Sequence, residues 1–323
     1  MRAVAIERKG GPEVMEAVER PAPEPGPGTV LVELGAAGIN YRDVYERTTP
    51  GYAGDPPRVL GVEGAGTVTR VGEGVTDLRP GDRVAWKEAP GSYAEQVVVP
   101  VREAVPVPDG LSDELAAAAL LQGVTAEYLT TSTYPVQPGD WVVVHAAAGG
   151  AGMLITQFAK IRGAHVLATT STEEKAELAR GAGADEVVRY EELLARANEL
   201  TGGAGVAAVY DGVGRDTFDT SLQTLRPRGT MVLFGSSSGG PDPVDPMRLA
   251  RGGSLHLTRP TLVHYTATRD ELVRRAEDVF GLVADGRLAI RIGGRYALED
   301  ARRAHEDLEA RRTTGKLLLD PRT

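Results

Sequence analysis

The amino-acid sequence predicts an α/β protein in which a compact β-rich unit precedes a doubly wound parallel sheet. Three observations support this. The first 120 residues hold short β-type runs between glycine and proline turns. From residue 141 onward, apolar strands alternate with amphipathic helices. A glycine-rich turn joins the first of those strands to its helix. The first pattern is typical of a small barrel or sandwich, and the other two of a nucleotide-binding sheet.

The β-rich part has turn sequences at 23–28 ("PEPGPG") and 79–82 ("RPGD"). Its clearest strands are predicted at 29–40, 65–72, 82–86 and 93–100. Alanine- and leucine-rich residues 111–132 then predict a helix, with Ser112 or Asp113 as its cap and a break near Gly123.

The second part predicts a parallel sheet, because its strands are continuously apolar, as expected when helices cover both faces. The strands are expected at 141–146, 165–170, 186–190, 230–235 and 254–260, and a further strand with its glycine loop at 205–214. The helices are expected at 151–162, 172–181, 191–200 and 215–225. Ser171, with Glu174 three residues later, has the spacing of a capping box. The tail predicts a helix at 269–288, a strand near 289–296 and a helix near 298–311, all packing on the first unit.

Composition excludes several classes of function. The 323 residues carry a net charge of −9, which makes nucleic acid an unexpected partner. The absence of cysteine excludes disulfides, thiolate nucleophiles and cysteine-type zinc sites, and the five histidines lack close metal-ligand spacing. We therefore expect no metal site. No apolar run approaches a membrane span, and the N-terminus lacks a signal-peptide core, so we expect a cytoplasmic protein.

The stretch 145–152 reads "HAAAGGAG" and predicts a dinucleotide cradle. The usual fingerprint is Gly-x-Gly-x-x-Gly, and Ala147 occupies the first glycine position here. Alanine can serve if that position does not need a positive φ. Gly149, Gly150, Ala151 and Gly152 would then let a pyrophosphate approach the helix N-terminus.

The end of the second parallel strand favours NADPH over NADH. It lacks the carboxylate that holds the ribose of NAD, whereas Ser171, Thr172 and Lys175 offer hydroxyls and a cation for a 2′-phosphate. Two alternatives stay open: Lys175 as a solvated helix residue, and Glu173 or Glu174 bending back to a ribose. Tyr190, "DGVG" (211–214) and "FGSSSG" (234–239) end the next strands at the same sheet edge.

Ordered motifs along the chain resemble a known family. Residues 56–84 are similar to the signature of the medium-chain dehydrogenase/reductase superfamily. The quinone oxidoreductase, or zeta-crystallin-like, branch is resembled by "GGPEV" (10–14), "GIN" (38–40), "HAAAGG" (145–150), "YDGVGRDT" (210–217), "FGSSSG" (234–239), "GSLHLTRP" (253–260) and "AHEDLEAR" (304–311).

The resemblance implies a GroES-like β-barrel catalytic domain over 1–122 with 265–323, and an NADPH-binding Rossmann domain over 123–264. It also implies a homodimer and zinc-independent quinone reduction, because zinc-using relatives carry a cysteine where Asn40 stands. Carried over by position, the cofactor site comprises Asn40, Tyr41, Arg42, Asp43, Val44, Tyr45, Tyr128, Gly150, Ala151, Ser171, Thr172, Lys175, Tyr190, Val213, Gly235, Ser236, Ser237, Ser238, Pro260, Thr261, Leu262 and Arg311.

The leading functional hypothesis is hydride transfer from NADPH to a quinone. Asn40, Tyr45 and Tyr52 are the catalytic candidates, the tyrosines as hydrogen-bond donors or aromatic walls, with simple packing as the alternative. Glu63, near the metal in zinc relatives, is expected to be structural. Two other functions stay open: reduction of an activated C=C bond in an enal, enone or acyl thioester, and non-catalytic NADPH binding in a crystallin-like or RNA-binding protein.

Overall fold

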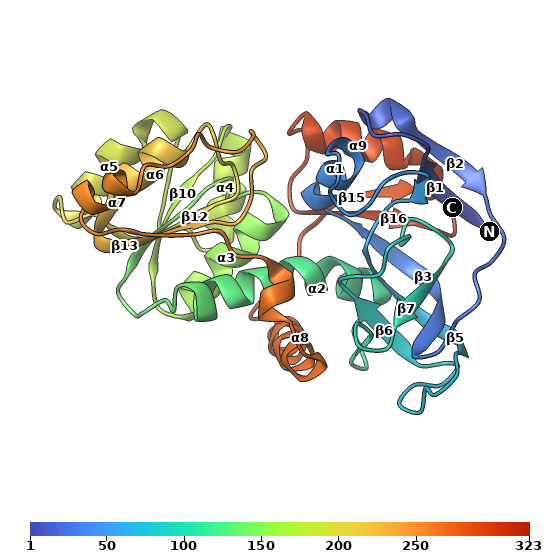
Figure 1. Ribbon diagram of the computed structural model, residues 1–323. Helices are drawn as coiled ribbons and strands as arrows, with labels where there is room; N and C mark the ends of the chain where they lie inside the picture. The colour runs from blue at the N-terminus through green and yellow to red at the C-terminus, as the bar shows by residue number, and fades with distance from the viewer. The chain divides into compact units, whose positions relative to one another are not determined.

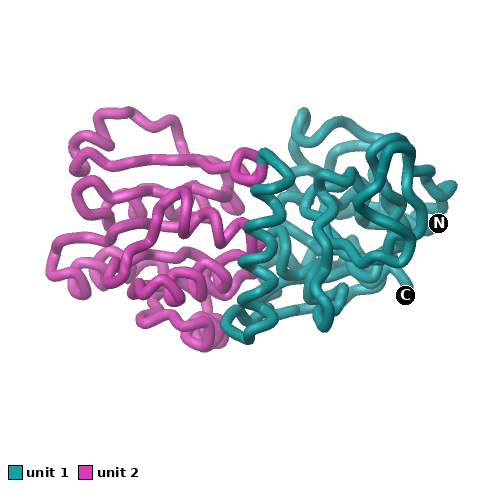
Figure 2. Tube along the Cα trace, turned by 90° about the horizontal axis from the view of Figure 1, so that it is seen from below, with its two compact units in different colours: residues 1–121, 267–323 teal, residues 122–266 magenta.

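The computed structural model describes residues 1–323, which divide into two compact units (Figure 2). Unit 1 comprises residues 1–121 and 267–323, and unit 2 comprises residues 122–266. The chain therefore leaves unit 1 once and returns to it for its last 57 residues. None of its helices combines the length and the apolar character that crossing a membrane requires.

Unit 1 is built mainly from β-structure, as the turn-rich sequence predicts (Figure 1). A three-stranded sheet has the order β2-β1-β4, and a larger sheet has the order β15-β16-β3-β5-β6-β8, with β7 also pairing with β3. The strands are β1 (Arg2–Ile6), β2 (Met15–Glu19), β3 (Thr29–Ile39), β4 (Arg58–Val59), β5 (Glu63–Val71), β6 (Arg83–Trp86), β7 (Gln96–Pro100), β8 (Val105–Pro106), β15 (Ile292–Ala297) and β16 (Lys316–Asp320).

Strand β16 is absent from the sequence expectations, and it lies between β15 and β3 in the larger sheet. It pairs antiparallel with β3 and parallel with β15. Its register sets Leu317 opposite Ile39, so Lys316 comes next to Asn40, the residue that follows β3. The helices of unit 1 are α1 (Tyr41–Thr48), α8 (Arg269–Ala284) and α9 (Ala301–Glu309), with 3₁₀ turns η1 (Pro12–Val14) and η5 (Leu298–Asp300).

Unit 2 is the predicted doubly wound domain. Its six strands are all parallel, in the order β11-β10-β9-β12-β13-β14, so the strand order reverses between β9 and β12. The strands are β9 (Trp141–Val144), β10 (His165–Thr169), β11 (Glu186–Val188), β12 (Val206–Asp211), β13 (Leu225–Leu233) and β14 (His256–Thr258). The helices are α3 (Gly150–Ile161), α4 (Glu173–Gly181), α5 (Leu193–Thr201), α6 (Phe218–Thr224) and α7 (Pro246–Arg251), with η3 (Tyr190–Glu192) and η4 (Leu262–Tyr265).

Two local predictions were wrong. Helix α2 (Asp113–Tyr128) runs through Gly123 without a break, and the irregular segment is a π-helical turn at Leu129–Thr133. Buried alanines and leucines around Gly123 offset the cost of about 1 kcal/mol for a glycine in a helix. Helix α4 is capped by Thr172 and not by Ser171, because the Thr172 hydroxyl accepts the Lys175 N–H at 3.3 Å. The Ser112 cap is confirmed, since its hydroxyl accepts the Leu115 N–H at 3.2 Å.

Candidate active site

The glycine-rich loop of unit 2 delivers an open helix N-terminus to the sheet edge. Three consecutive valines form β9, and α3 begins at Gly150, directly after the loop. Gly149 precedes the helix with φ −77° and ψ 163°, and no side chain caps it. The first amides of α3 have no carbonyl partner within the helix, and the helix dipole adds positive potential there. The cradle therefore fits a pyrophosphate.

The glycine positions of this loop are set by backbone contacts. A Cβ added at Gly152 would lie 2.5 Å from the Ala146 carbonyl oxygen and 2.9 Å from Ala147 Cα. The left-handed residue of the turn is Ala146, with φ 49°, and not Ala147. The condition under which Ala147 can replace the first glycine of the fingerprint is therefore met.

A buried polar network joins the strand ends behind the cradle. His145 contacts the Thr169 hydroxyl through Nδ1 at 2.8 Å and the Ser221 hydroxyl through Nε2 at 2.9 Å. Asp211 accepts hydroxyl hydrogen bonds from Thr217 at 2.7 Å and Ser221 at 3.0 Å. Burial lowers the pKa of His145, and the opposing effect of Asp211 is smaller, so the imidazole is neutral.

These residues have the composition of a Ser-His-Asp triad but not its chemistry. Ser221 and Asp211 are fully buried, and His145 is 1% exposed, so no substrate carbonyl can approach the hydroxyl. The network instead holds the ends of β9, β10 and β12 and helix α6 at fixed spacing. Tyr190, a predicted site residue, stacks on the His145 ring with centroids 5.8 Å apart.

Glu173 does not face the end of β10, where the 2′-phosphate is predicted to bind. That carboxylate accepts a hydrogen bond from Arg180 at 2.7 Å along the surface of α4. Ser171 and Thr172 are exposed at the edge. The Thr170 N–H donates to the Val188 carbonyl oxygen at 3.2 Å. Arg189, the residue after Val188, is thereby placed beside the end of β10.

Arg189 was missed in the sequence, and its Nη1 is buried without a hydrogen-bond partner. A guanidinium nitrogen in that state suits an anionic oxygen of a ligand. The available signal was a basic residue directly after the third parallel strand, beside Tyr190.

The loops after β12 and β13 lie together. The Val213 carbonyl accepts the Ser238 N–H at 2.9 Å and its hydroxyl at 2.8 Å, and Ser237 N–H reaches Gly212 O at 3.2 Å. A Cβ at Gly235 would approach Gly212 O to 2.6 Å. Ser236 lies in the same segment as Ser237 and Ser238. Elsewhere in unit 2, the rings of Tyr128 and Tyr265 stack with their centroids 4.2 Å apart. The remaining predicted residues of unit 2 follow β14 and lead into η4: Pro260, Thr261 and Leu262.

In unit 1, a buried ammonium group joins two residues singled out from the sequence. Lys316 Nζ lies 2.8 Å from Asn40 Oδ1 and 2.5 Å from Glu63 Oε2. Asn40 Nδ2 donates to the same Glu63 oxygen at 2.7 Å, and the Leu121 N–H donates to Glu63 Oε1 at 2.7 Å. The Lys316 and Glu63 side chains are 1% and 0% exposed. Glu63 is therefore structural, as expected, and Lys316 fixes the orientation of the Asn40 amide.

Lys316, Asn40 and Glu63 thus form a buried cluster in which the cation is part of the chain itself. No group of three or more histidine, cysteine, aspartate or glutamate side chains is placed to hold a metal ion. Asn40 and Glu63 thus share their side-chain oxygens with the Lys316 ammonium group. Lys316 was missed in the sequence, although a lone lysine before three leucines was a signal for burial.

Beneath Asn40, a second buried network anchors helix α1. The Asp43 carboxylate accepts the Asn40 N–H and the Tyr93 hydroxyl, both at 2.8 Å. The Tyr93 oxygen lies 3.2 Å from His305 Nε2. Burial raises the pKa of Asp43 to about 6, against the effect of these hydrogen bonds. Burial lowers the pKa of His305 to about 3, so that the ring is neutral.

Three predicted tyrosines form one aromatic cluster. Tyr41 and Tyr45 pack edge-to-face with ring centroids 5.3 Å apart, and Tyr45 and Tyr52 do so at 6.0 Å. Lys9 Nζ fixes the segment that carries Tyr52, because it donates to the carbonyls of Glu46 at 2.6 Å, Tyr52 at 3.1 Å and Gly54 at 2.8 Å. Tyr52 remains 38% exposed.

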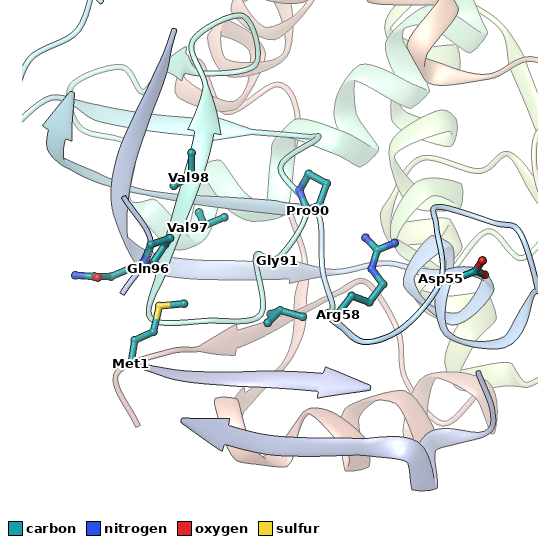
Figure 3. A pocket seen from close by; sticks show the side chains of 10 residues that line it. Met1, Asp55, Arg58, Pro90, Gly91, Gln96, Val97 and Val98 are labelled. Carbon is teal, nitrogen blue, oxygen red and sulfur yellow. The ribbon is translucent and has the colours of Figure 1, made fainter. Parts of the chain in front are cut away.

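The other predicted residues of unit 1 have different surroundings. Arg42 forms a two-point ion pair with Glu88. Val44 is a core residue at 4% exposure, and Arg311 is exposed just after α9. A shallow pocket of about 370 Å³ lies elsewhere in unit 1, lined by Arg58, Asp55 and strand β7, and includes none of the predicted site residues (Figure 3).

Comparison with known proteins agrees with this two-part organisation. Residues 26–109 match the alcohol dehydrogenase GroES-like domain, and residues 150–278 match the family described as zinc-binding dehydrogenase. The fold and these matches define a medium-chain dehydrogenase/reductase.

Full-length relatives narrow the family. The chain is 44% identical to a quinone oxidoreductase of Pseudomonas aeruginosa over 97% of both chains. It is 39% identical to a 2-haloacrylate reductase of Burkholderia sp., covering 99% of this chain and 98% of the relative. The crystal structure of Escherichia coli quinone oxidoreductase complexed with NADPH superposes with a TM-score of 0.97 at 41% identity, covering 99% and 100% of the two chains. The chain belongs to the quinone oxidoreductase family.

Proposed function

We propose that this protein is an NADPH-dependent quinone reductase. The observation that carries the proposal is the uncapped N-terminus of α3, set among small residues at the carboxyl ends of a parallel sheet. The NADPH-complexed Escherichia coli relative supports the choice of cofactor. When bound, NADPH supplies a hydride that, with one proton from solvent, converts a quinone to a hydroquinone and leaves NADP⁺.

The residues of unit 2 would bind and orient the cofactor. Gly149, Gly150, Ala151 and Gly152 would hold the pyrophosphate at the α3 N-terminus. Ser171, Thr172, Lys175, Arg189 and Tyr190 would hold the 2′-phosphate, and the engagement of Glu173 by Arg180 favours NADPH over NADH. The remaining groove would be formed by Tyr128, Val213, Gly235, Ser236, Ser237, Ser238, Pro260, Thr261 and Leu262.

The residues of unit 1 would act near the nicotinamide and the substrate. Lys316 and Glu63 hold the Asn40 amide in one orientation, so Asn40 would position a carboxamide or a substrate oxygen. Burial raises the pKa of Tyr52, so its phenol stays protonated and can donate a hydrogen bond to a quinone oxygen as charge develops. Tyr45 would form an aromatic wall for a planar ring. Tyr41, Arg42, Asp43, Val44 and Arg311 complete the proposed cofactor end.

A quinone suits this site because it is already an electrophile and needs no Lewis acid. We propose a zinc-independent reaction for that reason, together with the ammonium group beside Asn40. We also propose that 1–122 with 265–323 is the catalytic domain and 123–264 the NADPH-binding domain, and that the protein is a cytoplasmic homodimer. Sedimentation analysis would test whether the protein is a homodimer.

The experiment is a turnover assay that follows NADPH absorbance with 1,4-benzoquinone and 9,10-phenanthrenequinone. Neutral 2-alkenals and 2-chloroacrylate test the second candidate, reduction of an activated C=C bond, which the Burkholderia relative favours. Oxidation with quinones supports the proposal. If NADPH is oxidised only with the alkenes, the second candidate function replaces the first. If NADPH is oxidised with none of these substrates, both candidate functions are contradicted.

A further inference from the structure

The ion pair of Arg42 and Glu88 lies at the surface of unit 1. Arg42 belongs to the first turn of α1, and Glu88 follows β6 by two residues. Both terminal nitrogens of Arg42 donate to the carboxylate, Nη2 to Oε1 at 2.6 Å. The two side chains keep 25% and 36% exposure, so a solute can reach them.

Arg42 follows Tyr41 in helix α1, which also carries Tyr45, and these two rings form one cluster with Tyr52. Both charges of the ion pair act on Tyr52. Burial is the main effect that raises the pKa of Tyr52; Arg42 lowers this pKa and Glu88 raises it. A charge that shifts the ionisation of this phenol would also act on a charged molecule bound against it. The ion pair therefore contributes to the electrostatic potential at the proposed substrate position.

The neighbouring charges are already engaged. Glu46 is buried and pairs with Arg58 at 2.5 Å. Asp43 is buried within its own hydrogen-bond network. The Lys9 ammonium donates to three backbone carbonyls. Glu88 is thus the carboxylate that neutralises Arg42, and its removal would leave Arg42 without its anionic partner.

We propose that Glu88 is a specificity-determining residue that directs the site toward neutral quinones and against anionic substrates. This inference rests on the proposed quinone reductase function and names its substrate class. An anionic substrate would meet the Glu88 carboxylate and find Arg42 already occupied. Repulsion of the wrong ligand is a general means of specificity. 2-Haloacrylate, in the name of the Burkholderia relative, carries the kind of carboxylate that this pair would disfavour.

The test compares two quinones that share a ring system, neutral 1,2-naphthoquinone and anionic 1,2-naphthoquinone-4-sulfonate. Its readout is the ratio of their kcat/KM values, anionic over neutral. Glu88→Gln should raise this ratio about tenfold at low ionic strength, and the gain should shrink at about 0.5 M salt because exposed charges are screened. The double variant Arg42→Gln/Glu88→Gln should lose the gain, because the liberated cation is gone.

The matched control is Glu114→Gln. Glu114 forms the same two-point pair with Arg295 in unit 1, at 2.9 and 2.8 Å, and lies outside the proposed site. This variant loses the same charge and should leave the ratio unchanged. An equal rise in the control, or no rise in Glu88→Gln while 1,2-naphthoquinone is still reduced, overturns the inference and leaves the quinone reductase proposal standing. Failure of the unaltered protein to reduce any quinone overturns both.

Discussion

Replacing Lys316 with methionine tests how much the buried ion pair contributes to the stability of unit 1. The substitution keeps most of the side-chain volume but removes the partner of Glu63, which is 0% exposed. Breaking a buried ion pair on one side costs about 3–5 kcal/mol, because the remaining charge stays desolvated. In a domain of this size each kcal/mol shifts Tm by about 2–4 °C, so Tm should fall by about 10 °C.

The double variant Lys316→Met/Glu63→Gln separates the loss of charge compensation from the loss of packing. Removing both charges should restore most of the stability, to within about 1.5 kcal/mol of the unaltered protein. Urea unfolding can be followed in unit 1 alone, because Trp86 lies in unit 1 and the second tryptophan, Trp141, can be replaced by phenylalanine. A single variant that loses less than about 1 kcal/mol, or a double variant as unstable as the single one, would refute the reasoning.

Three further predictions concern the cofactor cradle and α1. Gly152→Ala should lower NADPH affinity and stability, because its Cβ would lie 2.5 Å from Ala146 O. Gly181→Ala, with open space around its Cβ at the end of α4, should leave NADPH affinity unchanged and should not lower stability, as measured by fluorescence titration and thermal melts. Lys175→Ala and Arg189→Gln should each raise the KM for NADPH, with little change in kcat and no change in the KM for NADH. The expected loss of NADPH binding free energy is about 1.5–3 kcal/mol, the contribution of a charge-assisted hydrogen bond. Equal effects on the KM values of both cofactors would contradict the 2′-phosphate assignment. Asp43→Asn keeps the acceptor oxygen for Tyr93 but cannot ionise. The folded pKa of Asp43 is raised from 3.8 to about 6, so ionisation destabilises the unaltered protein. Its free energy of unfolding should therefore fall by about 2.5 kcal/mol relative to that of the variant as pH rises from about 4 to 7, measured by urea unfolding.

The parts of this fold that the sequence predicts are those with local signals. The strands of unit 2 carry runs such as Val142–Val144, their helices show apolar spacing, and the glycines of the cradle follow one another in the chain. Local signals failed where two neighbouring choices have similar energies. Ser171 and Thr172 are both good caps, and only the backbone position of Lys175 decides between them.

Lys316 and Glu88 were missed because their partners lie far away in the chain. Lys316 meets Asn40 across 276 positions, and Arg42 meets Glu88 across 46. Strand β16 is only five residues long, so its place beside β3 depends on packing that no local pattern encodes. Each missed partner compensates a charge that the local pattern leaves unexplained: Glu63 is a carboxylate at the start of a buried strand, and Arg42 is a cation in the first turn of a helix, where the dipole disfavours one. A charge in an unfavourable local setting is therefore itself evidence for a distant partner. At Arg42 that partner also alters the charge that a substrate would meet, so in our proposal a nonlocal pairing sets the protein's choice of substrate.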